Sequence, residues 1–108
     1  MGLLAGRNDL DLLQRTGVGR DINRHYYSEA ELSEALRQPV VQQLCDLIRF
    51  RNAHPAFDGD FAMPDAPDQA LYLEWRNGGD WAWLHVDFPS RNASIRWSGP
   101  EGQGQWLL

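Results

Sequence analysis

Polar and apolar residues in the first third of the chain are spaced as in two short helices. Asn8 or Asp9 can cap a helix with a narrow face of leucines, and Gly17 ends it. Residues 28–31 read Ser-Glu-Ala-Glu, which is a capping box: the serine hydroxyl accepts from the last glutamate's N–H, and that glutamate accepts from the serine N–H. The pattern predicts a second short helix that runs to about Gln38.

A longer amphipathic helix is predicted immediately afterwards. Pro39 suits the first turn of a helix, and the helical period continues until just before Pro55. The positions spaced by three and four define one face that we expect to be buried, formed by Val40, Val41, Leu44, Leu47, Ile48 and Arg51.

The second half of the chain changes to a period of two, which is typical of strands. Residues 57–69 are rich in glycine, proline and aspartate and are expected to form a connecting loop. Apolar and polar residues then alternate over 70–76 and 81–88, with an Asn-Gly-Gly-Asp turn between them. A third strand over 93–97 and an edge strand at the C-terminal end are expected, with the glycine-rich run between them loose.

The order of elements predicts an α+β chain in which helices precede a small antiparallel sheet. A length of 108 residues suits one compact unit. We expect a helical part over residues 1–56 and a sheet part over residues 57–108.

Composition narrows the range of partners. The net charge of -5 and the absence of a basic block argue against nucleic-acid and anionic-membrane partners. All ten basic side chains are arginines, which favour planar, bidentate contacts. The lone Cys45 cannot form an internal disulfide, and no apolar run approaches the ~20 residues of a membrane span. A cytoplasmic protein is therefore expected.

Residues 17–27, Gly-Val-Gly-Arg-Asp-Ile-Asn-Arg-His-Tyr-Tyr, concentrate charge and aromatic rings without helical or strand period. Arg20, Asp21 and Arg24 can form a fork that holds sugar hydroxyls or an anion, while the two glycines let the backbone approach a ligand closely. His25 and the tyrosines after it can add a hydrogen-bonding wall. The simpler alternative is a loop pinned by arginine–carboxylate pairs, with the aromatic rings closing a core.

No complete catalytic set is present in the sequence. Asp9, Asp11 and Asp21 are possible acids, but a glycosidase needs two carboxyl groups held across a bound sugar. The histidines at 25, 54 and 85 lack neighbours at metal-ligand spacing, and His54 is expected to be a positive charge at a helix C-terminus. We therefore predict no catalytic residue, no metal site and no cofactor.

The predicted strand over 81–88 places Trp81, Trp83 and His85 on one face. Flat aromatic side chains in a row can stack on sugar rings. A sheet that packs on both sides shows the same pattern, and we favour packing because large apolar surfaces usually mark interfaces.

Two long strings resemble the C-terminal part of sucrose phosphorylases and their relatives, including glucosylglycerate phosphorylase. They are GLLAGRNDLDLLQRTGVGRDINRHYYSEAEL and PVVQQLCDLIRFRNAHPAFDGDF, and the resemblance covers roughly residues 2–88. Enzymes of this family are retaining glucosyl-transferring enzymes with an α-amylase-type (β/α)₈ barrel.

The resemblance implies that the segment up to about residue 27 is the last βα loop, at the catalytic face of the barrel. Arg20 would then hydrogen-bond the glucosyl unit in the donor subsite, and Asp21, Asn23 and Arg24 would brace the loop. The helix from Pro39 would be the final barrel helix. The strands would form the C-terminal sheet, which the family links with dimerisation.

The family's nucleophile, acid/base and transition-state-stabilising carboxylates come from earlier strands, and nothing in this sequence corresponds to them. The resemblance thus implies a C-terminal portion that is inactive by itself. The alternatives are a stand-alone oligomeric interaction or carbohydrate-binding module, and an enzyme assembled in trans. Because the long helix lacks the strands that it would cover, we expect the chain to form a two-fold homodimer.

Overall fold

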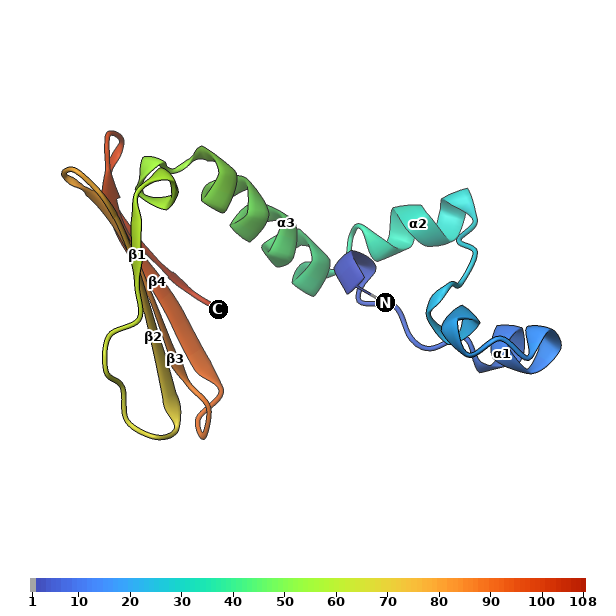
Figure 1. Ribbon diagram of the computed structural model, residues 1–108. Coiled ribbons are helices and arrows are strands. Elements are labelled where there is room, and N and C mark those ends of the chain that lie inside the picture. Colours follow the sequence, from blue (N-terminus) through green and yellow to red (C-terminus); the bar gives the residue numbers. More distant parts are fainter. Residues whose placement is uncertain (1) are drawn as a thin grey trace. The chain divides into compact units, whose positions relative to one another are not determined.

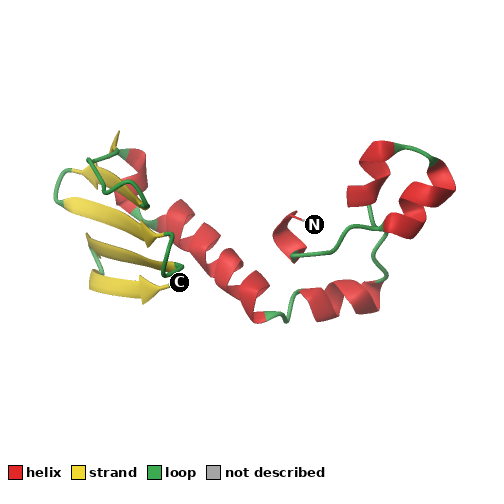
Figure 2. Cartoon of the chain, turned by 90° about the horizontal axis from the view of Figure 1, so that it is seen from below, coloured by secondary structure: helices red, strands yellow, loops and turns green. Residues whose placement is uncertain are grey.

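The computed structural model describes residues 2–108 and confirms the α+β class, with helices first and a five-stranded antiparallel sheet after them (Figure 1). The chain divides into two compact units, of which the first ends at Arg49 and the second is Phe50–Leu108. Helices and strands are segregated along the chain (Figure 2). The division between residues 56 and 57 that the sequence suggests stays a prediction.

The helices of the first half begin where local capping residues stand. In chain order the elements are η1 (Gly2–Leu4), α1 (Leu10–Thr16), η2 (Gly19–Asn23), α2 (Glu29–Ala35) and α3 (Pro39–Ala53), where η denotes a 3-10 helix. The predicted second helix is shorter than expected, because its last regular residue is Ala35 and tighter turns follow up to Gln38.

Helix α1 is closed at both ends by residues that the sequence indicated. The Asp9 carboxylate accepts a hydrogen bond from the Leu12 N–H (2.8 Å). Gly17 has a left-handed backbone (φ 66°) and donates its N–H to the Leu13 carbonyl (2.8 Å). Only glycine adopts this conformation without steric cost, so α1 ends here.

The capping box of α2 is confirmed. The Ser28 Oγ accepts from the Glu31 N–H (3.3 Å), and the Glu31 Oε2 accepts from both the N–H and the hydroxyl of Ser28 (2.7 Å each). These reciprocal bonds satisfy backbone donors that would otherwise lack a partner in the first turn.

Helix α3 matches its predicted bounds, but the burial expected for its apolar face is wrong for most of that face. Val41 is 1% exposed, whereas Val40, Leu44 and Ile48 are 55%, 37% and 42% exposed. An amphipathic helix buries its stripe only where another layer covers it. The apolar side chains of α3 therefore remain largely uncovered in this chain.

The second half forms a meander in which every strand pairs antiparallel with its neighbours in the chain, in the order β1-β2-β3-β4-β5. The elements are η3 (Pro55–Asp58), β1 (Asp60–Ala62), β2 (Ala70–Asn77), β3 (Asp80–Asp87), β4 (Asn92–Gly99) and β5 (Gly102–Leu107). Strand β1 lies in the segment that the sequence predicted to be a loop. Three residues are too few for a period of two to be visible in the sequence. The glycine-rich run expected to be loose forms the tight β4–β5 hairpin.

One face of the sheet forms the core of the second unit. Ala82 and Ile95 are buried at its centre. The Phe50 ring packs against Trp97 and Trp106, with ring centroids 4.9 and 5.0 Å apart. A second aromatic pair is formed by Phe57 and Trp75, at 5.0 Å. Aromatic packing thus attaches η3 and the end of α3 to the sheet.

His54 follows the last residue of α3 and caps the next element. Its Nδ1 accepts a hydrogen bond from the Ala56 N–H (3.3 Å), so the residue is the N-terminal cap of η3. The His54 Nε2 is buried and has no hydrogen-bond partner among residues 2–108. The positive charge expected for this histidine stays a prediction.

Candidate functional site

The segment singled out in the sequence forms a compact loop around η2. Arg20 and Asp21 belong to this 3-10 helix, and Arg24 is its C-terminal cap. Both arginines are exposed, whereas Asp21 and His25 are half-buried. The four residues that the sequence proposed for substrate binding therefore lie within one turn and its exit.

Backbone hydrogen bonds hold this loop in place. The Asp9 N–H donates to the Ile22 carbonyl (2.8 Å), which brings the start of α1 against the end of η2. Within the turn, the Asp21 N–H donates to Val18 and the Arg24 N–H donates to Asp21, each at 2.9 Å. These backbone bonds define the turns of the loop.

The guanidinium groups of Arg20 and Arg24 form no ion pair with any carboxylate of residues 2–108. The alternative in which arginine–carboxylate pairs pin the loop is therefore wrong for the part of the chain that the structure describes. An exposed guanidinium presents five N–H donors in a planar fork, which suits vicinal hydroxyls, carboxylates or phosphates.

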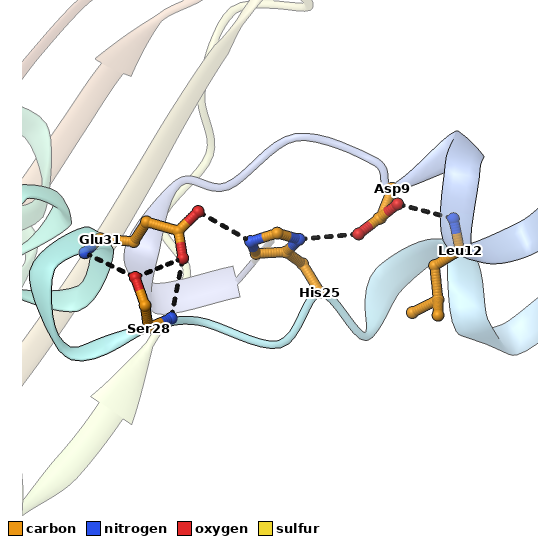
Figure 3. A network of polar contacts seen from close by, with 5 residues as sticks. All are labelled: Asp9, Leu12, His25, Ser28 and Glu31. Carbon is orange, nitrogen blue, oxygen red and sulfur yellow. Dashed lines mark hydrogen bonds and ion pairs between the residues drawn. The ribbon is translucent and has the colours of Figure 1, made fainter.

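His25 lies between two carboxylates (Figure 3). Its Nδ1 is 2.7 Å from the Asp9 Oδ2, and its Nε2 is 3.4 Å from the Glu31 Oε1. The Tyr27 ring meets the imidazole edge-on, with centroids 4.8 Å apart. Both ring nitrogens are thus engaged within the protein, which leaves the substrate-binding role of His25 a prediction.

These contacts shift the acidity of all three groups. The hydrogen bond to Asp9 raises the pKa of His25 against a smaller opposing effect of burial, and the contact with Glu31 adds to the rise. The same bond is the main cause that lowers the pKa of Asp9, followed by the Leu12 N–H. The pKa of Glu31 is lowered chiefly by the Ser28 N–H and hydroxyl.

The His25 contacts escaped the sequence analysis. The sequence identified Asp9 as a helix cap and a possible acid, and Glu31 as a member of a capping box, because capping is a local property. Asp9 and His25 are sixteen residues apart in the chain, and no periodicity links them. A hollow of about 490 Å³ lies beside this pair, bordered by residues 6–11, His25 and Tyr27.

The second candidate, the aromatic face of β3, consists of rings that pack on one another. Trp81 and Trp83 have centroids 4.7 Å apart, and His85 lies nearly parallel to Trp83 at 6.4 Å. From β2, Tyr72 contacts His85, and the Arg76 guanidinium lies over the Trp83 ring, 5.6 Å from its centroid. The four aromatic rings are half-buried, which agrees with the packing interpretation.

Within residues 2–108, no group of three or more histidine, cysteine, aspartate or glutamate side chains is arranged to hold a metal ion. Across the same residues, every helix is too short or too polar to cross a membrane.

No family model matches the chain. Comparison with curated proteins finds a sucrose phosphorylase of Agrobacterium vitis that is 50% identical over 99 residues, 92% of this chain and 20% of that protein. A sucrose phosphorylase of Bifidobacterium adolescentis is 42% identical over 98% of this chain and 21% of its own length. A glucosylglycerol phosphorylase of Marinobacter adhaerens is 39% identical over 94% of this chain and 21% of its own length.

Among solved structures, the crystal structure of sucrose 6F-phosphate phosphorylase from Thermoanaerobacter thermosaccharolyticum matches 99% of this chain with a TM-score of 0.93 and 36% sequence identity. The match covers 22% of that protein's chain. This chain thus spans about a fifth of the length of the relatives that it matches.

Proposed function

Because the chain corresponds over nearly its whole length to the C-terminal region of sucrose phosphorylases and their relatives, we propose that it supplies the glucosyl-binding loop of a retaining glucosyltransferase of this type. The observation that supports this proposal is the exposed guanidinium of Arg20, which has no ion pair within residues 2–108 and projects from a loop held by backbone bonds. A side chain with free donors on an ordered support is suited to hold a sugar.

In this proposal Arg20 donates hydrogen bonds to hydroxyls of the glucosyl unit. Asp21, on the same turn, can accept a hydrogen bond from a hydroxyl, and Arg24 at the end of the turn adds a second set of donors. His25 was expected beside them, but its nitrogens are occupied by Asp9 and Glu31. Its contribution is therefore to the position of the loop.

We propose that the chain by itself performs no glucosyl transfer. Retaining transfer needs a nucleophilic carboxylate and an acid/base held about 5 Å apart around the sugar. Asp9 and Glu31 both lie near His25, but each is committed to the imidazole and to capping a helix. In an enzyme as long as these relatives, the catalytic carboxylates would come from the other four fifths of the chain.

The test is a chimeric enzyme in which residues 2–108 replace the matching region of the Agrobacterium vitis sucrose phosphorylase. We expect this chimera to cleave sucrose in a phosphate-dependent reaction and the 108-residue chain to show no such activity. Arg20→Ala should reduce kcat/KM by roughly 10- to 100-fold, the loss typical of hydrogen bonds from a charged group.

Arg37→Ala is the matched control, because Arg37 is an exposed arginine outside the loop. It should leave kcat/KM unchanged. Equal kcat/KM values for Arg20→Ala and the parent chimera, with circular dichroism showing both folded, would contradict the assignment of Arg20.

We also propose that the isolated chain forms a homodimer through its helices. The supporting observation is the uncovered apolar surface of α2, its C-terminal cap and α3, which comprises Leu32, Leu36, Val40, Leu44 and Ile48. Burial of such a side chain is worth about 1.5–3 kcal/mol, which favours association. Sedimentation velocity at micromolar concentration should show a dimer, and a folded monomer would contradict the proposal.

We propose a cytoplasmic location because Cys45, on α3, is a half-buried free thiol. Thiols remain reduced in that compartment. Mass spectrometry of fractionated cells after thiol alkylation would test it, and an oxidised cysteine in an exported fraction would contradict it.

A further inference from the structure

The His25 imidazole connects the starting points of two helices. Asp9 immediately precedes α1 and caps it, and Glu31 belongs to the first turn of α2 and completes its capping box. His25 lies between η2 and α2 and contacts both carboxylates, at 2.7 and 3.4 Å (Figure 3). One side chain therefore joins two caps that would otherwise be independent.

Both contacts are attractive only when the ring carries two protons. A neutral imidazole has a single N–H donor, and its other nitrogen carries a lone pair. Ionised carboxylates only accept hydrogen bonds, so a neutral His25 can satisfy Asp9 or Glu31 but would direct a lone pair at the other. Only the imidazolium form donates to Asp9 and also presents an N–H to Glu31.

Asp9 connects His25, and thereby its protonation state, to the loop. Its N–H bonds the Ile22 carbonyl, its Oδ1 accepts from Leu12, and its Oδ2 contacts His25. The contacts of Asp9 thus connect the two ends of the segment 10–24. The loop that carries Arg20 lies within this segment.

We infer that His25 is a positioning residue for Arg20: as an imidazolium it joins the caps of α1 and α2 and holds residues 10–24 in order, and loss of one proton releases this clamp. The inference rests on the proposed function only in treating Arg20 as a sugar ligand.

The surrounding charges support the protonated form. Besides Asp9 and Glu31, the groups near the ring are Tyr27, Arg7 and Asp11, which border the adjoining hollow, while Arg15 on α1 acts on Asp9. The two carboxylates in direct contact outweigh the opposing effect of burial, and the pKa of His25 is raised accordingly.

A raised pKa gives the clamp a defined pH range. Its stabilising effect is complete below the ordinary histidine pKa of about 6.5 and is lost as the pH rises through the raised value. The pKa values of Asp9 and Glu31 are lowered, so the carboxylates stay ionised until the solution is distinctly acidic. The clamp should therefore be closed in mildly acidic solution and open above the raised pKa of His25.

Two substitutions separate the clamp from helix capping. Asp9→Asn keeps a good N-cap for α1, and Glu31→Gln keeps a capping box for α2, but each removes one negative charge. His25→Asn places an amide nitrogen near the position of Nδ1 and removes the titration. His85→Asn is the control, since it deletes a histidine of the sheet unit.

The first measurement uses the 108-residue chain with no ligand. Side-chain NMR of His25 and amide hydrogen exchange of residues 10–24 are followed between about pH 5 and about pH 9, around the ordinary histidine pKa. Protection of the loop, corrected for intrinsic exchange, should fall severalfold in step with the titration of His25. Asp9→Asn should lower the titration midpoint more than Glu31→Gln, because the Asp9 contact is shorter and Asp9 is 17% exposed against 52% for Glu31.

His25→Asn should remove the pH dependence of loop exchange, and His85→Asn should leave it unchanged. A His25 titration midpoint at or below the ordinary value would overturn the inference. Loop protection that does not change as His25 titrates would also overturn it.

The second measurement compares pH profiles of KM and kcat in the chimeric enzyme. We expect KM for the glucosyl donor to rise on the alkaline side, and the rise to begin at lower pH in Asp9→Asn. If Arg20→Ala raises KM while the KM profiles of Asp9→Asn and the parent coincide, the clamp is overturned and the proposed function stands. If loop exchange follows His25 while Arg20→Ala leaves kcat/KM unchanged, the proposed function is overturned and the clamp stands.

Discussion

The Trp97 indole lies against the backbone of Gly104, its antiparallel partner on β5. A Cβ at position 104 would be 2.3 Å from the Trp97 Cζ2. The ring cannot easily retreat, because it also packs on Phe50 and on Trp106, with centroids 4.9 and 5.3 Å away. The glycine is therefore a packing requirement of the sheet core.

Gly104→Ala should destabilise the second unit by about 1–3 kcal/mol, the usual cost of forcing extra volume into a packed core. Urea unfolding followed by tryptophan fluorescence measures this directly, since all five tryptophans lie in the second unit. Gly79→Ala is the control, because a Cβ there has no heavy atom within 4 Å and its φ is not positive. Equal unfolding midpoints for the two variants would contradict the packing explanation.

Ser28→Ala should destabilise α2 by about 0.5–2 kcal/mol, because it removes the acceptor for the Glu31 N–H. Hydrogen exchange of the α2 amides at fixed pH reports the change. Ser33→Ala, within the same helix, should be neutral or slightly stabilising, since alanine has the higher helix propensity. Faster exchange in Ser33→Ala than in Ser28→Ala would argue against the capping box as the main stabilising feature.

Acid should weaken the starts of α1 and α2. Groups with lowered pKa values contribute stability above their ordinary pKa of about 4 and lose it as the pH falls through the lowered values. Asp9 and Glu31 both have lowered pKa values, so far-UV circular dichroism should show helix loss on the acidic side. The double variant Asp9→Asn/Glu31→Gln should flatten this acid transition, and an unchanged transition would show that other carboxylates cause it.

The aromatic face of β3 should not bind free sugar. Trp81, Trp83 and His85 stack on one another and are half-buried, so little ring surface is left for a ligand. Titration with glucose or sucrose into the tens of millimolar should leave tryptophan fluorescence unchanged apart from a linear solvent effect. A saturable change that Trp83→Phe abolishes would instead favour the carbohydrate-binding alternative.

Features that depend on near neighbours in the chain could be predicted from the sequence. The caps at Asp9 and Ser28, the start of α3 at Pro39 and the alternation in β2 and β3 all follow from contacts a few residues apart. The resemblance on the strings around Arg20 likewise identified the loop and the family region to which it corresponds. Local hydrogen bonding and period suffice for such conclusions.

Contacts between distant residues were decided only by the tertiary structure. The partnership of His25 with Asp9 and the place of Gly104 against Trp97 join groups that no periodicity relates. The sequence by itself determined the three α-helices, the strands β2 to β5 and the loop that carries Arg20 and Arg24. The tertiary structure decided which nitrogen faces which carboxylate and which apolar face stays uncovered, because hydrogen bonding and burial depend on distances in space that residue spacing does not encode.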